Sequence, residues 1–188
     1  TCALPICGEF YFAVNIPAAV ASNENLIRMM ETARQQLRQP QISPRLVLEL
    51  AENADLSRHG KIAGNMARLQ QRGFRIMLDD CFSQSSVLFP VRALTFSAYK
   101  LDMGIINDMQ RDAHALALIK SLIYYCRLIG SRCIAEGVDS LEKFNKLKTL
   151  GVDHFQGNAI SAPVGRENVA EIIQQLSGEA EYPSGIAV

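Results

Sequence analysis

The sequence predicts an α/β fold in which parallel strands and helices alternate to form an incomplete barrel. Segments with strand-like and helix-like apolar patterns alternate along the chain, and each predicted strand ends in polar side chains. The 188 residues contain about six such β-α units. An eight-unit barrel usually takes about 250 residues, so about two units are missing from the pattern.

The composition is that of an ordinary globular domain. Hydrophobic residues make up 48% of the chain and charged residues 20%, with 19 basic and 19 acidic side chains. This balance leaves no net field to attract a nucleic-acid polymer or an acidic membrane surface. No apolar run approaches the roughly 20 residues that span a bilayer, and no signal-peptide pattern is present. The five cysteines lack a C-x-x-C motif and the three histidines are scattered, so we expect reduced thiols and a cytoplasmic domain.

The two ends of the chain differ from the part between them. The chain begins without Met, and its first residues, TCALPI, are also encoded by the end of a common sequencing adapter. We expect residues 1–9 to be a non-native or truncated start and residues 177–188 to be a flexible tail. Residues 10–176 form the predicted barrel domain.

The first half of the chain predicts three strands separated by helices. FYFAVNI (10–16) is a buried strand, and NENLIRMMETARQQLRQ (23–39) has helical spacing. RLVLELAE (45–52) is a second apolar strand. HGKIAGNMARLQQRG (59–73) repeats apolar residues every three or four positions and ends at a glycine, as helices do. FRIMLDD (74–80) is the third strand.

The second half continues the alternation after an irregular connection with a short helix that breaks before Pro90. LTFSAYKLD (94–102) is the fourth strand, and ALALIKSLIYYCRLIG (115–130) is a strong helix with a terminal glycine. SRCIAEGV (131–138) is the fifth strand, followed by the helix at 140–151. A short strand at 154–157 and a helix near 165–176 complete the predicted elements.

Polar side chains at the strand ends distinguish a barrel from an open sheet. An open α/β sheet gathers its functional groups at one switch point, whereas the strand ends of a barrel all surround one central site. Every predicted strand here contributes: Asn15, Glu49 and Glu52, Asp79 and Asp80, Lys100 and Asp102, Glu136, and Gln156. The predicted fold is therefore an incomplete TIM-like (β/α) barrel with about six of eight units.

This set of side chains suits a two-metal site. Carboxylate and amide oxygens in this number are ligands for Mg²⁺ or Mn²⁺ rather than zinc. Two metals about 4 Å apart activate a water and stabilise the leaving oxygen of a phosphodiester, and a nearby lysine can neutralise developing charge. Singly, each residue has a structural explanation: Asp79 as a cap, Glu52 as an arginine partner, Lys100 as a solvated charge. Together they favour a metal site.

Several motifs in register resemble one family. The matching segments are VNI (14–16), LELAE (48–52), LDD (78–80), KLD (100–102), AEGVD (135–139) and QGNAISAP (156–163). In order and spacing they resemble the EAL-domain family, bacterial phosphodiesterases that hydrolyse cyclic di-GMP to linear pGpG on a modified TIM barrel. The resemblance covers residues 10 to about 176.

The resemblance implies a role for each matching residue. Asn15, Glu49 and Asp79 correspond to metal ligands, Asp80 to the carboxylate shared between two metals, and Glu136 to a further carboxylate of the metal site.

The remaining matches lie around that site. Lys100 corresponds to the residue that positions the attacking water, and Gln156 to a residue on the rim. Glu52 corresponds to the glutamate that anchors the loop after the paired aspartates.

The family also implies partners and cellular context. Cyclic di-GMP is the expected ligand, and family members often form homodimers. Many carry an upstream sensory, membrane or diguanylate-cyclase domain, so the parent protein can be membrane-anchored while this domain is cytoplasmic. No motif for binding a nucleic-acid polymer is present in the chain.

Two departures from the family pattern leave the function open. The E-A-L motif, whose glutamate is a metal ligand, is absent, and the missing units leave an open sheet edge. The loop pattern D-D-F-G-T-G-Y-S-S is replaced by DDCFSQSSV, with Phe82 and Gln84 where the family has glycines.

Two interpretations follow. In the first, the parent domain is a cyclic di-GMP phosphodiesterase and this fragment is impaired. In the second, it is a non-catalytic receptor for cyclic di-GMP or a protein-interaction adaptor. A third, another metal-dependent TIM barrel, fits the KLD and AEGVD spacing less well.

Overall fold

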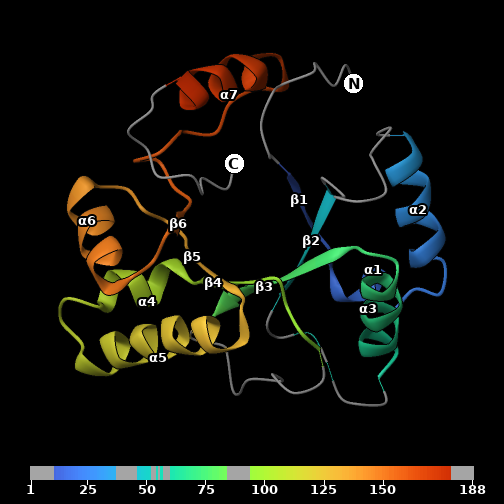
Figure 1. Cartoon of the computed structure of the whole chain (residues 1–188), viewed down its shortest axis with the longest axis horizontal. Coiled ribbons are helices and arrows are strands. Elements are labelled where there is room, and N and C mark those ends of the chain that lie inside the picture. Colours follow the sequence, from blue (N-terminus) through green and yellow to red (C-terminus); the bar gives the residue numbers. More distant parts are fainter. Residues whose placement is uncertain are drawn as a thin grey trace.

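The protein consists of six parallel strands and their connecting helices (Figure 1). The structure is a computed structural model that describes residues 11–36, 46–51, 54, 56, 60–83 and 94–178. The strands are β1 (Phe12–Asn15), β2 (Leu46–Ala51), β3 (Arg75–Cys81), β4 (Ala98–Leu101), β5 (Arg132–Ala135) and β6 (His154–Phe155). The α-helices are α1 (Ala18–Ala21), α2 (Leu26–Gln36), α3 (Lys61–Gln71), α4 (Met103–Asp108), α5 (Ala113–Ile129), α6 (Leu141–Leu150) and α7 (Val169–Gly178). A 3₁₀ turn, Arg166–Asn168, precedes α7.

The strand order confirms the incomplete barrel. All neighbouring strands pair in parallel, and the sheet runs β1-β2-β3-β4-β5-β6 in sequence order. A doubly wound sheet would reverse its order at a switch point, and this sheet does not. The strands form a half-barrel with helices around its outside (Figure 1). Polar groups at the strand ends therefore share one edge, as the sequence predicts.

Side chains alternate between two apolar layers. Leu48, Leu78 and Tyr99 belong to the large core in which the sheet packs against the helices. On the other face, Val47, Met77, Ala98 and Ile134 form a small inner cluster against which Tyr11 packs. Strands buried on both faces have nearly continuous apolar sequences, as RLVLELAE and FRIML do.

Two helices were not predicted from the sequence. Helix α1 follows Pro17, which stands at the N-cap position, and contains four residues, too few for a periodic pattern. Helix α4 follows β4 directly, because the Asp102 carboxylate accepts a hydrogen bond from Gly104 N–H at 2.8 Å. The strand expected at 94–102 is correspondingly shorter, and Asp102 caps a helix.

Helix α5 begins and ends at signals visible in the sequence. The Asp112 carboxylate accepts from His114 N–H at 2.7 Å, and Gly130 ends the helix with φ +71°. Within the part of the chain that the structure describes, no helix has both the length and the apolar character needed to cross a membrane. The short helix expected before Pro90 lies outside the described residues.

We predict opposite effects of alanine at two glycines. Gly157 follows β6 with φ +151°, and a Cβ there would lie 2.4 Å from the backbone N and O of Val138. Gly157→Ala should therefore lower the free energy of unfolding by about 1–3 kcal/mol. Gly64 lies in α3, and outside the helix's own backbone no atom lies within 4 Å of an added Cβ. Gly64→Ala should therefore raise the free energy of unfolding by about 0.5–1 kcal/mol. Urea denaturation of both variants measures this, and effects of the same sign would contradict the prediction.

Candidate metal centre

Four adjacent elements bring acidic and basic side chains to the carboxyl edge of the sheet. Glu49 lies within β2, Asp79 and Asp80 near the end of β3, and Lys100 in β4. Glu136 comes directly after β5, and its N–H donates to the Leu101 carbonyl at 3.2 Å, which continues the sheet ladder. The parallel register therefore gathers side chains from distant parts of the sequence at one end of the half-barrel.

Lys100 is the centre of this group. Its Nζ atom lies 2.9 Å from Glu49 Oε1, 3.0 Å from Asp79 Oδ1 and 2.6 Å from Glu136 Oε1. Only 3% of the lysine side chain is exposed. A buried ammonium is stable only when ionised partners surround it, and three carboxylates do so here.

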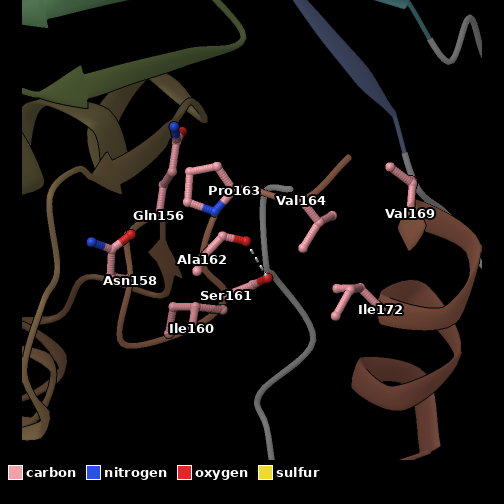
Figure 2. Close-up of a pocket in the computed structure, with 10 residues that line it drawn as sticks. Gln156, Asn158, Ile160, Ser161, Ala162, Pro163, Val164, Val169 and Ile172 are labelled. Carbon is pink, nitrogen blue, oxygen red and sulfur yellow. Dashed lines mark hydrogen bonds between the residues drawn. The ribbon is translucent and has the colours of Figure 1, made fainter. Parts of the chain in front are cut away.

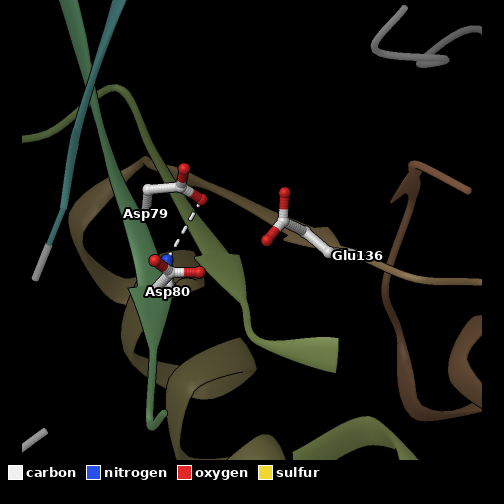
Figure 3. Close-up of side chains that lie close together, drawn as sticks. All are labelled: Asp79, Asp80 and Glu136. Atoms are coloured by element: carbon white, nitrogen blue, oxygen red, sulfur yellow. Dashed lines mark hydrogen bonds between the residues drawn. The ribbon is translucent and has the colours of Figure 1, made fainter. Parts of the chain in front are cut away.

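Asp79, Asp80 and Glu136 form a compact oxygen cluster. One carboxylate oxygen from each lies within 4.8 Å of the others. Figure 3 shows the carboxylates of Asp79 and Glu136 turned toward each other. Asp80 has φ +57°, and its N–H donates to Asp79 Oδ1 at 3.0 Å. That left-handed turn, which aspartate tolerates, lets two consecutive carboxylates reach the same cluster.

The crowding shifts the pKa values of these groups. Burial raises the pKa of Glu136 to about 7, and the neighbouring Lys100 ammonium opposes this rise. Burial also raises the pKa of Asp80, with the charges of Asp79 and Asp102 adding to it. Burial favours neutral Lys100, but Glu136, Glu49 and Asp79 outweigh it and raise the pKa of the lysine, which stays charged. The raised pKa values show that negative charge on Glu136 and Asp80 is costly at this edge, and a bound cation would reduce that cost.

The other predicted site residues lie at the margin or outside the description. Asn15 is exposed at the end of β1, and its Cα pairs in register with that of Glu49 on β2. Gln156 is exposed directly after β6. Glu52 lies outside the described residues. The structure therefore gathers Glu49, Asp79, Asp80, Lys100 and Glu136, and places Asn15 one strand away.

Gln156 lines an apolar cavity beside this edge. The cavity has a volume of about 390 Å³ and lies between the segment after β6 and helix α7. Ile160, Val164 and Ile172 supply part of its apolar lining, and Ser161 and Asn158 add polar groups (Figure 2). This cavity offers an apolar surface next to the acidic edge.

The donor set fits magnesium or manganese. The atoms that converge are carboxylate oxygens from Asp79, Asp80 and Glu136. Glu49 forms an ion pair with Lys100, which also contacts Asp79 and Glu136. Hard oxygen ligands of this kind select Mg²⁺ and Mn²⁺ over softer metals. The described cysteines, Cys81, Cys126 and Cys133, form no disulfide and are buried among apolar residues.

The loop that follows β3 begins in an unfavourable conformation. Phe82 has φ +66°, in the left-handed region where glycine is favoured and bulky side chains are rare. Its side chain is half-buried against the main core, which holds the residue in place. Phe82 occupies one of the positions at which the sequence lacks the expected glycine, and the strain lies two residues from Asp80. Gln84 lies outside the described residues.

Fold and site together define a class: a parallel, barrel-like α/β domain with a carboxylate-rich centre at the strand ends. The EAL domain model matches residues 6–163, so this chain belongs to the EAL domain family. This membership confirms the resemblance carried by the sequence motifs.

One sequence comparison and two structure comparisons show the extent of the similarity to known proteins. The bifunctional diguanylate cyclase/cyclic di-GMP phosphodiesterase MucR of Pseudomonas aeruginosa is 25% identical over 162 residues, or 86% of this chain and 23% of MucR. A solved cyclic di-GMP complex of the PaMucR phosphodiesterase matches 85% of this chain and 64% of that one, with 24% identity and a TM-score of 0.75. The structure of Klebsiella pneumoniae BlrP1 with manganese and cyclic di-GMP matches 78% of this chain and 37% of the BlrP1 chain, with 19% identity and a TM-score of 0.69.

These matches establish the fold and the family context. The two structural likenesses show that this chain shares the fold of the matched parts of those proteins, and EAL relatives include cyclic di-GMP phosphodiesterases. The chain spans less than a quarter of the length of the first curated relatives that it matches. Those relatives are therefore larger proteins with additional segments.

We predict that glycine is better than alanine at position 82. Both Phe82→Gly and Phe82→Ala lose the packing of the ring, but only glycine relieves the left-handed backbone. The free energy of unfolding should be about 1 kcal/mol higher for Phe82→Gly than for Phe82→Ala, the reverse of the usual order. Urea denaturation of the two variants gives the difference, and a more stable alanine variant would show that φ is not positive at this position.

Proposed function

We propose that the parent domain of this chain hydrolyses cyclic di-GMP to linear pGpG with two divalent cations, Mg²⁺ or Mn²⁺. The observation that carries the proposal is the convergence of Glu49, Asp79, Asp80, Glu136 and Lys100 at the carboxyl edge of an EAL-family half-barrel. Carboxylates in this arrangement suit phosphodiester hydrolysis, in which negative charge develops on phosphate oxygens.

Each residue takes a role that its position supports. The residues that would hold the cations are Asn15, Glu49, Asp79, Asp80 and Glu136, and by resemblance to the family Asp80 would be the shared carboxylate. When bound, the cations activate a water and stabilise the leaving oxygen of the phosphodiester.

The other three residues act around the cations. Lys100 orients the attacking water through its ammonium, which is charged and fixed by its carboxylate partners. Glu52 anchors the loop after the paired aspartates, and Gln156 lies on the rim beside the apolar cavity. The oxygen of the attacking water bonds to one phosphorus of the cyclic dinucleotide, one ring P–O bond breaks, and the leaving oxygen takes up a proton, so the product is linear.

The 188-residue chain is expected to be impaired by itself. The family's E-A-L glutamate, a metal ligand, is not in the sequence, and β1 and β6 are the outermost strands of the sheet among the described residues. The strained Phe82 lies in the loop that follows the paired aspartates. The same loop favours the second candidate function, a receptor for cyclic di-GMP or an adaptor without turnover.

Hydrolysis of cyclic di-GMP distinguishes the two functions. We expect the chain, extended with the residues that precede it in its parent protein, to form pGpG with Mg²⁺ or Mn²⁺ and to lose at least 100-fold in kcat on Asp79→Asn. The unextended chain should turn over more slowly than the extended one. Chromatographic detection of pGpG measures both.

A matched control separates chemistry from folding. Asp139 pairs with Lys143 at 2.8 Å, outside the acidic cluster, so Asp139→Asn should leave turnover within twofold of wild type. Binding of cyclic di-GMP without turnover by a folded, extended protein would favour the receptor, and neither binding nor turnover would favour the adaptor.

A further inference from the structure

Lys100 has more carboxylate partners than the positioning of a water requires. We infer that Lys100 is a built-in counter-cation, whose ammonium holds the acids of the metal centre together and competes with divalent cations for their oxygen atoms. The inference rests on the proposed function of these acids as metal ligands and deepens it, because it assigns Lys100 a role in metal affinity.

The competition follows from shared ligands. Lys100 Nζ lies within 3.0 Å of oxygens from Glu49, Asp79 and Glu136. Asp79 and Glu136 also belong to the group whose oxygens lie within 4.8 Å of one another. An ammonium and a divalent cation that use these carboxylates repel each other strongly at such short range, in a site with little water. Metal binding must therefore weaken the ion pairs of Lys100.

The same ion pairs stabilise the protein without metal. Four carboxylates meet at this edge, and buried like charges at short range oppose folding. Lys100 is the side chain that contacts three of them, and it is almost fully buried. Replacing it with an apolar residue leaves the acids without this cation, so a divalent cation should then contribute more to stability.

Charge balance indicates what the competition achieves. Glu49, Asp79, Asp80 and Glu136, when ionised, carry four negative charges, and Lys100 reduces the total to three. In this chain, two divalent cations on these four carboxylates would then leave the centre with one net positive charge, whereas without the lysine they would leave it neutral. Lys100 thus lowers metal affinity but keeps the loaded centre attractive to an anionic phosphodiester.

Lys143 provides a matched control. Its Nζ atom lies 2.8 Å from Asp139 Oδ2 and 2.7 Å from Asn107 Oδ1, so it is also paired and hydrogen-bonded. Its single carboxylate partner is more than half exposed, and neither residue belongs to the acidic cluster. Removing this ammonium changes a lysine ion pair without changing the metal centre.

Calorimetric titration with Mn²⁺ tests the inference on the 188-residue chain after treatment with EDTA. We expect Lys100→Met to bind Mn²⁺ with a Kd at least tenfold lower than that of wild type, and Lys143→Met to stay within twofold. In EDTA, Lys100→Met should also melt at a lower temperature than wild type, and added Mn²⁺ should raise its Tm by more. Lys100→Gln is measured alongside, because its amide still donates hydrogen bonds but carries no charge. The same decrease in the Kd for Mn²⁺ is expected for this variant.

The outcomes separate this inference from the proposed function. If wild type binds Mn²⁺ and the folded Lys100 variants bind it equally or more weakly, Lys100 is no competitor, whereas the metal centre stands. If wild type and the folded variants all fail to bind Mn²⁺, the inference is overturned, and formation of pGpG by the extended chain still decides the proposed function. If Lys100→Met is unfolded in EDTA, refolding with Mn²⁺ supports the inference. If it stays unfolded, the Kd of Lys100→Gln decides, and a value as weak as that of wild type overturns the inference.

Discussion

The contact between one lysine ammonium and three carboxylates is the interaction on which the functional edge of this domain depends. Lys100 reaches Glu49, Asp79 and Glu136 because neighbouring strands of the sheet lie close enough for their side chains to meet at one end. Breaking a buried ion pair by removing one partner costs roughly 3–5 kcal/mol. The cluster therefore constrains β2, β3, β4 and the end of β5, as well as providing chemistry.

The apolar layers of the sheet make this arrangement possible. Val47, Met77, Ala98 and Ile134 fill the inner face, on the same side of the strands as the acids. The opposite face is packed against the helices, so the strands have little freedom to separate. Water is limited around Lys100, which strengthens its ion pairs and makes any unpaired charge there costly.

The segment after β3 combines functional and strained residues. Asp80 tolerates its positive φ because aspartate is among the residues that adopt this conformation, and its N–H donates to Asp79. Phe82 adopts a similar φ without that tolerance and is held by its contact with the core. A backbone that glycine would adopt at no steric cost is thus maintained by packing. This links the stability of the core to the shape of the loop beside the acids.

The sequence by itself determined the alternation of strands and helices, the incomplete barrel, and the polar residues at the strand ends. These features follow from the spacing of apolar residues and from the glycine and aspartate residues at the ends of elements, all of which are local in the sequence. The tertiary structure decided which of those residues meet. It placed Lys100 among three acids, left Asn15 and Gln156 exposed, and made Asp102 the cap of α4. Register and burial depend on contacts between segments far apart in the chain, and a local pattern contains no information about those distances.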